Sequence, residues 1–228
     1  DLVVGNEGQP NQFLMNNSGT FASPVAVGLA MSTQAIALAD VDGVGGTELI
    51  VGTDGSGILL YKFSGSAFAA PVTIDGAVRK TTSLAVGDID GDGDNDLISG
   101  TWDGPNRLYF NVGGIFDAGL NASFDADPTM GVAVGQLDGL PGLDLVVGNE
   151  RRPGRVYRFE TVEGVSGYRY GRDLGVDPQL LQAQRQLEPI EVSDGLFVAV
   201  TSNATATLRI HAGAYLQASH DALLNSLA

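Results

Sequence analysis

The segment 87–100, GDIDGDGDNDLISG, concentrates negative charge directly before residues that look like core. Its acidic side chains stand at every second position: Asp88, Asp90, Asp92, Asp94 and Asp96. Two carboxylates about 4 Å apart repel by roughly 4 kcal/mol at an effective dielectric constant of about 20. The segment is therefore either an ordinary solvated turn, for which Asp and Gly are well suited, or a loop that binds a cation.

Calcium fits this loop best, because it takes about six to eight oxygen ligands at once. Gly93 follows the third aspartate and allows the loop to wrap tightly around one ion. Magnesium ranks second, since it demands stricter octahedral geometry and retains its waters. We predict that the calcium ligands are the backbone carbonyl of Asp94 and the side chains of Asp88, Asp90, Asp92 and Asp96.

Two other loops resemble this one but have lost acidic residues. DVDGVGGTE at 40–48 has Val44 at the fifth position, and QLDGLPGLD at 136–144 has Gln136 and Leu140 where acids are needed. We interpret the latter as a packed turn without metal. One strong site among degenerate copies indicates that the ion holds the fold together and does no chemistry. For the loop 40–48 we predict a weaker second metal site, formed by Asp40, Asp42 and Glu48.

The three loops belong to an internal repeat. The segments DLVVG, ELIVG, DLISG and DLVVG begin at residues 1, 48, 96 and 144, with spacings of 47, 48 and 48 residues. A second landmark keeps this period and ends on Phe21, Phe68 and Phe116. A fixed period of this length is typical of a repeat architecture.

Each repeat contains four short segments with strand character, separated by turns rich in Gly, Asp, Asn and Pro. Four strands in every 40 to 50 residues or so is the spacing of propeller blades, which pack radially on one another. We therefore predict an all-β fold, a β-propeller of four-stranded blades with about five blades in this chain. A closed five-bladed ring and an open part of a larger propeller both fit. In the best-preserved unit the strands are expected at 82–89, 96–102, 107–112 and 115–121.

The blades are expected to form a single domain over 1–228. The segment 167–187 is interpreted as an inserted loop with a short helix at 178–187, and SDG at 193–195 replaces the acidic loop in a degenerate fifth unit. The approximate boundaries of the predicted blades are 1–34, 35–81, 82–129, 130–187 and 188–218, with a C-terminal tail at 219–228.

Composition limits the partners of this chain of 228 residues. Its net charge of −15 opposes contact with nucleic acid and with anionic membranes. No apolar stretch approaches the length of a membrane span, so membrane insertion is not expected. Cysteine is absent, so no disulfide contributes to the fold. The chain opens on Asp1, and we expect a processed product or a piece of a longer protein.

The segments DIDGDGDNDLISG and RLYFNVGGIF resemble the FG-GAP/VCBS-type repeat of integrin α-chain propellers and many bacterial surface proteins. The similarity covers residues 1 to about 165 well and 188–217 poorly. It implies an extracellular protein, secreted or on the cell surface, with calcium in the loop between the first two strands of a blade. It also implies adhesion or carbohydrate recognition. Alternatives are the propeller portion of a polysaccharide-processing enzyme and a self-associating structural subunit of an extracellular assembly.

A glycan or protein ligand is expected on the face opposite the acidic loops, where we predict loops at 6–12, 53–57, 101–107 and 149–155. Trp102 offers either a sugar platform or a plug between blades. The nearby arginines suit a carboxylated or sulfated glycan, or form a solvated face with local salt bridges. The predicted ligand contacts are Trp102, Asp103, Asn106, Arg107, Arg151, Arg152 and Arg155.

No residue pattern points to catalysis. His211 and His220 stand in neither a metal-ligand pattern nor a triad pattern, and nothing singles out an acid and a base among the carboxylates. We therefore predict that the protein is not an enzyme. The catalytic alternative is a polysaccharide lyase or hydrolase, with Tyr168 or Tyr170 and the adjacent arginines in the case of a lyase.

Overall fold

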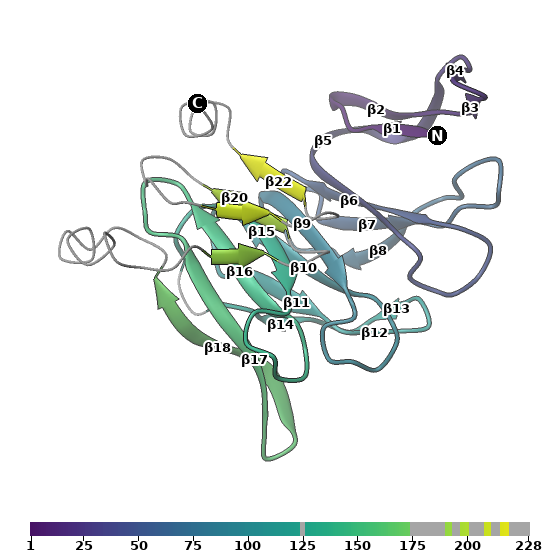
Figure 1. Ribbon diagram of the computed structural model, residues 1–228. Coiled ribbons are helices and arrows are strands. Elements are labelled where there is room, and N and C mark those ends of the chain that lie inside the picture. Colours follow the sequence, from purple (N-terminus) through teal and green to yellow (C-terminus); the bar gives the residue numbers. More distant parts are fainter. Residues whose placement is uncertain (124–125, 174–189, 193–196, 201–207, 211–214, 219–228) are drawn as a thin grey trace.

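The computed structural model describes residues 1–123, 126–173, 190–192, 197–200, 208–210 and 215–218. Every regular element in these ranges is a β-strand, and most strands pair antiparallel with a neighbour along the chain (Figure 1). The all-β fold class and its antiparallel sheets are therefore confirmed. Nothing in the described ranges forms a helix long and apolar enough to cross a bilayer.

The best-preserved repeat forms a four-stranded antiparallel sheet with the order β14-β11-β10-β9. A separate hairpin of β12 (Asn111–Val112) and β13 (Ile115–Phe116) splits both predicted outer strands. Its turn residues Gly113 and Gly114 have φ values of +58° and +86°, which a tight two-residue turn requires. The strands of the main sheet are β9 (Thr81–Gly87), β10 (Asp96–Thr101), β11 (Arg107–Tyr109) and β14 (Leu120–Asn121).

The next repeat forms a second four-stranded sheet, β15-β16-β17-β18. The prediction of a loop from residue 167 onward was wrong for 167–173, because this segment pairs in register with β17 and buries Tyr168 opposite Phe159. The predicted helix at 178–187 lies outside the described residues. The strands are β15 (Thr129–Gly135), β16 (Asp144–Asn149), β17 (Arg155–Val162) and β18 (Val165–Asp173).

The N-terminal part forms a six-stranded sheet, β1-β2-β5-β6-β7-β8, and a small hairpin of β3 and β4. The long strand β5 pairs with β2 over residues 25–32 and with β6 over residues 33–39, so the predicted blade boundary at 34–35 falls inside one continuous strand. The predicted loop at 6–12 was also wrong, because most of it is strand β2. The bounds are β1 (Leu2–Val4), β2 (Glu7–Leu14), β3 (Asn16–Asn17), β4 (Thr20–Phe21), β5 (Val25–Ala39), β6 (Glu48–Thr53), β7 (Ile58–Tyr61) and β8 (Val72–Asp75).

Four short strands are described in the degenerate unit. They pair in parallel, β19 with β21 and β20 with β22, and β20 lies against β15 and β16. The predicted turn at 193–195 and the predicted tail at 219–228 lie outside the described residues, as do both histidines. The bounds are β19 (Ile190–Val192), β20 (Phe197–Val200), β21 (Leu208–Ile210) and β22 (Tyr215–Ala218).

Two hydrophobic cores lie between consecutive sheets, and another is formed by strands β2, β5, β6 and β7 of the six-stranded sheet. Strands β6, β10 and β16 are buried at every residue. Leu49 and Val51 of β6 pack into one core, whereas Ile50 packs with Leu97 of β10 into the next, and Ile98 packs into a third. A strand covered on both faces needs no polar side, which explains the apolar runs ELIVG, DLISG and DLVVG. The acidic loops all precede these buried strands.

Candidate metal centre

The loop between β9 and β10 brings three of its aspartates together. Asp88, Asp90 and Asp96 each present a carboxylate oxygen within 4.8 Å of the others. The N–H of Gly91 donates to Asp88 Oδ1 at 2.8 Å, and the N–H of Gly93 donates to Asp88 Oδ2 at 3.1 Å. Both glycines have positive φ, +82° and +100°, so the tight wrap predicted from their positions is present.

Asp96 is the buried member of this group. Its carboxylate has no exposed surface and accepts hydrogen bonds from the N–H groups of Ile89 and Asn111, each at 2.9 Å. Burial raises the pKa of Asp96 to about 6; the two hydrogen bonds act in the opposite direction, and the charges of Asp90 and Asp92 raise the pKa further. A divalent cation would relieve both the desolvation and the repulsion.

The other two predicted ligands do not belong to the group of three. Asp92 Oδ1 accepts a hydrogen bond from the N–H of Asp94 at 2.9 Å. Asp94 Oδ2 accepts one from the N–H of Gly113 at 3.1 Å, in the β12–β13 hairpin. The carboxylate of Asp94 is thus engaged outside the loop, and the role of its backbone carbonyl as a ligand stays a prediction.

The acidic side chains of the loop 40–48 also lie close together, but a lysine from elsewhere in the chain pairs with one of them. Oxygens of Asp40, Asp42 and Glu48 lie within 4.8 Å of one another. Lys62 Nζ lies 2.7 Å from Asp42 Oδ2, and this hydrogen bond lowers the pKa of Asp42. Glu48 is 1% exposed; its Oε2 accepts from the N–H of Val41 at 3.1 Å, and its Oε1 has no hydrogen-bond partner.

In the loop 136–144 the side-chain amide of Gln136 holds the turn through hydrogen bonds. The side-chain Nε2 of Gln136 donates to the carbonyls of Leu140 and Gly142, and its Oε1 accepts from the N–H of Gly139 at 2.7 Å. Arg158 Nε lies 3.7 Å from Asp138 Oδ2. This geometry is that of the packed turn predicted for this loop.

Two asparagines connect the loop 88–96 to the preceding repeat. Asn95 Nδ2 donates to the carbonyl of Asp40 at 2.8 Å, and Asn111 Nδ2 donates to that of Val41 at 2.7 Å. The backbone N–H of Asn111 binds Asp96 at the same time. An ion at Asp96 would therefore stiffen the junction between two repeats. Neither Asn95 nor Asn111 was predicted from the sequence, because both are ordinary residues for a turn.

The predicted ligand loop 101–107 is only partly available for binding. Trp102 is half-buried under Lys80, whose Nζ lies 5.4 Å from the ring centroid, and Asp103 is exposed. Asn106 is 1% exposed and accepts a hydrogen bond from the N–H of Thr101 at 3.0 Å, so its side chain closes the loop from within.

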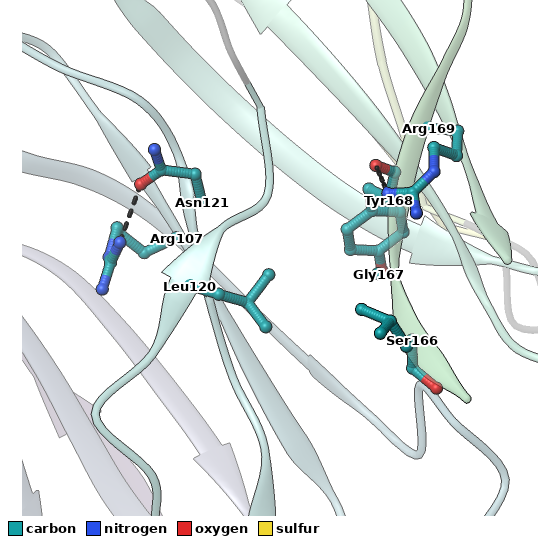
Figure 2. A pocket seen from close by; sticks show the side chains of 8 residues that line it. Arg107, Leu120, Asn121, Ser166, Gly167, Tyr168 and Arg169 are labelled. Atoms are coloured by element: carbon teal, nitrogen blue, oxygen red, sulfur yellow. Dashed lines mark hydrogen bonds between the residues drawn. The ribbon is translucent and has the colours of Figure 1, made fainter. Parts of the chain in front are cut away.

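Arg107 lies apart from Trp102, in a pocket of about 430 Å³ between β14 and β18 (Figure 2). Its guanidinium donates to Asn121 Oδ1 and to the carbonyl of Gly119, both at 2.7 Å. Tyr168 lines the same pocket but is 2% exposed, and its hydroxyl donates to the carbonyl of Leu143 at 3.0 Å. Trp102 and Asp103 are not among the lining residues.

The other three arginines predicted as ligand contacts, Arg151, Arg152 and Arg155, form local ion pairs. Arg155 Nη2 lies 2.7 Å from Asp127 Oδ2, and Arg152 Nε lies 3.8 Å from Oδ1 of the same residue. The side chain of Arg151 is 90% exposed and pairs with Glu150 at 3.8 Å. The exposed pairs of Arg151 and Arg152 contribute little to stability and suit a solvated face, whereas the side chain of Arg155 is only 18% exposed.

The family model described as FG-GAP-like repeat matches residues 40–99, a segment that contains both acidic groups. The predicted resemblance to FG-GAP-type repeat proteins is thereby confirmed. No curated protein matches the chain.

Two solved structures are similar over most of the chain. The crystal structure of the V. cholerae biofilm matrix protein Bap1 is 19% identical over 70% of this chain and 25% of its own, with a TM-score of 0.38. That of BBS1N in complex with ARL6DN, soaked with lead, is 12% identical over 73% and 64% of the two chains, also with a TM-score of 0.38. The chain thus spans less than two thirds of either protein.

Proposed function

We propose that this chain is a calcium-stabilised β-propeller module that serves recognition or adhesion outside the cell. One observation carries the proposal. Asp88, Asp90 and Asp96 converge in the loop between the first two strands of a four-stranded antiparallel sheet, inside the segment that matches the FG-GAP-like repeat.

The propeller architecture is supported by how the sheets meet. The first strands β5, β9 and β15 lie against one another in chain order, and apolar cores fill the spaces between consecutive sheets. This is the radial packing expected of blades. About five repeats of this kind form either a closed ring or part of a larger one.

Calcium fits the donor set of the loop 88–96. All of the gathered donors are carboxylate oxygens, the hard ligands that calcium prefers, and the glycines let the loop adjust to a large ion. Asp88, Asp90 and Asp96 would hold the ion, with Asp92 and the carbonyl of Asp94 as further ligands. When bound, calcium supplies the positive charge that allows the buried Asp96 to ionise.

An extracellular location suits such a site. Calcium sites of extracellular modules bind with Kd values of about 10⁻⁴–10⁻³ M, which an exposed loop with few preformed ligands can reach. The loops that follow β6, β10 and β16 lie at the opposite ends of these strands, where a glycan or protein ligand would find Trp102 and Asp103.

We further propose that the module is not catalytic. The alternative lyase requires a tyrosine that can act as a base. Burial, together with the charges of Asp144 and Asp96, raises the pKa of Tyr168 well above its usual value, and its hydroxyl already donates to Leu143. Such a hydroxyl is poorly placed to accept a proton from a substrate.

Thermal unfolding in millimolar calcium, in magnesium and in chelator tests the calcium function. An ion at about 100 times its Kd stabilises the folded state by roughly 2.7 kcal/mol, or about 5–10 °C for a domain of this size. Asp88→Asn should remove the calcium shift, whereas Asp103→Asn, an exposed aspartate at the other end of β10, should keep it. Equal midpoints in calcium and chelator would overturn the proposal.

Recognition is tested separately on a glycan array with the calcium-loaded protein. We expect binding to carboxylated or sulfated glycans that Trp102→Ala weakens and Val112→Ala, at an exposed position of the β12–β13 hairpin, does not. If no glycan binds, protein ligands remain as the partner class to screen.

A further inference from the structure

We infer that one position in each repeat, in or just after its third strand, decides whether the acidic loop of that repeat takes calcium. A cationic side chain there pairs with an aspartate of the loop, as Lys62 and Arg158 do, whereas Phe110 leaves the loop 88–96 to an external ion. The inference rests on the calcium function proposed above and extends it to the choice among loops.

The three positions are equivalent by strand register. Leu49 pairs with Tyr61, Leu97 with Tyr109, and Leu145 with Tyr157. The residue after each of these tyrosines is, in chain order, Lys62, Phe110 and Arg158.

Beside the loop 40–48, Lys62 provides the positive charge that a metal ion would otherwise supply. Lys62 Nζ reaches Asp42 Oδ2 at 2.7 Å. Glu48, 1% exposed, keeps Oε1 without a hydrogen-bond partner and belongs to the same group of oxygens within 4.8 Å. A buried, unpartnered carboxylate oxygen beside two further carboxylates is a cation-binding arrangement, and an ammonium group is the cation that the chain supplies.

In the loop 136–144 the same position carries an arginine. Arg158 Nε lies 3.7 Å from Asp138 Oδ2, the counterpart of Asp42 and Asp90 in the repeat. In the loop 88–96 that position is Phe110, whose ring lies 6.3 Å from that of Phe159 in a T-shaped contact. Among the residues whose side chains the structure describes, no lysine or arginine forms an ion pair with Asp88, Asp90 or Asp96.

The loop without a paired lysine or arginine also has the most negative net charge. Three acids and one lysine leave −2 around the loop 40–48, and five acids leave −5 around 88–96. Two acids and one arginine leave −1 around 136–144. A divalent cation is therefore attracted most strongly to the loop that lacks a cation of its own.

Isothermal titration with calcium chloride on the full chain tests the inference. The wild type should bind a single ion. Phe110→Lys should weaken that binding by at least about tenfold, through repulsion at short range. Phe110→Leu, which removes the ring without adding charge, should bind as the wild type does.

The reverse exchange is tested in the loop 40–48. Lys62→Met combined with Val44→Asp, which restores the missing acid, should create a second calcium site. The matched control is Val44→Asp with Lys80→Met, which changes the net charge equally but leaves Lys62 in place; it should bind a single ion. Circular dichroism should show that each variant is folded.

The outcomes separate the two proposals. If the wild type binds a single ion but Lys62→Met with Val44→Asp gains none, the role of Lys62 is wrong and the calcium function stands. Equal affinities of Phe110→Lys and Phe110→Leu would contradict the role of position 110 in the same way. A wild type that binds no calcium would overturn both proposals.

Discussion

The loops 40–48 and 88–96 have nearly the same backbone scaffold and differ in where their positive charge comes from. In both, an N–H three residues on donates to the first aspartate at 2.8 Å, Gly43 to Asp40 and Gly91 to Asp88. In both, the last acid is buried and accepts an N–H from the start of the loop. Only the first loop has a lysine within reach.

The two turns thus share their backbone hydrogen bonds although they differ in the positive charge near them. Hydrogen bonds from the backbone hold the turn in each loop, and the cation only balances the charge that the turn gathers. If the proposed calcium site is correct, a repeat would exchange calcium for a lysine through a change at that position together with the acids of its loop. The comparison predicts unequal consequences for the same change made in each loop.

The largest effect is expected from removing the buried acid. Asp96→Ala leaves the N–H groups of Ile89 and Asn111 without acceptors, at a cost of roughly 2–4 kcal/mol in chelator, and it abolishes the calcium shift. Glu48→Ala deprives only the N–H of Val41 and should cost less. Urea unfolding measures both. Equal costs would contradict the distinction between the two loops.

The next effect is expected in the pH dependence of stability, which should differ between the two loops. In the ion-free protein the pKa of Asp96 is raised from 3.8 to about 6, so its contribution to stability is complete below pH 3.8 and is lost as the pH rises through about 6. Calcium binds the ionised form, so the stabilisation by calcium should grow between pH 5 and pH 7, by roughly 1.4 kcal/mol for a group with a pKa of about 6.

The loop 40–48 has the opposite dependence. The hydrogen bond from Lys62 lowers the pKa of Asp42, so the stability from this pair is present above pH 3.8 and is lost only as the pH falls below it. Asp96→Asn should therefore flatten the calcium effect between pH 5 and pH 7, and Asp42→Asn should leave it unchanged. Scanning calorimetry at each pH provides the measurement.

A smaller loss is expected when the connection between the loops is cut. Asn111→Ala removes three side-chain hydrogen bonds, two donated to the carbonyls of Val41 and Asn95 and one accepted from the N–H of Gly114, and should destabilise the protein by roughly 1–3 kcal/mol. Asn17→Ala, on the exposed β3–β4 hairpin, is the control and should change little. The denaturation midpoint in urea measures the difference, and equal midpoints would show that the connection is dispensable.

The smallest loss of stability is expected from removing the ion pair between Lys62 and Asp42. The side chain of Lys62 is 48% exposed, so Lys62→Met alone should cost no more than about 1 kcal/mol. The cost should shrink further in high salt, because exposed charges are screened. A loss well above this value would mean that the lysine supports the loop by more than charge.

The strands that carry the cores were predictable from the sequence, whereas the outer strands were only partly so. Segments such as DLISG are apolar throughout because sheets cover both faces. Strands β2 and β18 contain Gly, Pro, Arg and Gln, which are typical of loops, and only their pairing with a neighbouring strand makes them regular. Local composition could not reveal that pairing.

The acidic residues of the candidate metal centre were predicted from the sequence, but the cationic side chains that pair with the related loops were not. The spacing of Asp88, Asp90 and Asp96 indicated a shared location, because all three stand in one short loop. Lys62 is twenty residues from Asp42 in the chain and on another strand, so no local motif contains both. The equivalence of Lys62, Phe110 and Arg158 was available from the repeat, but only the strand register gives it meaning.

The uninterrupted strand β5 has a mechanical consequence. Its first half is hydrogen-bonded to β2 and its second half to β6, without a flexible linker between the two. Tension on the amino terminus would therefore travel along covalent backbone into the sheet whose loop is neutralised by Lys62. A pull along β5 would load that sheet before the loop 88–96, which lies further along the chain.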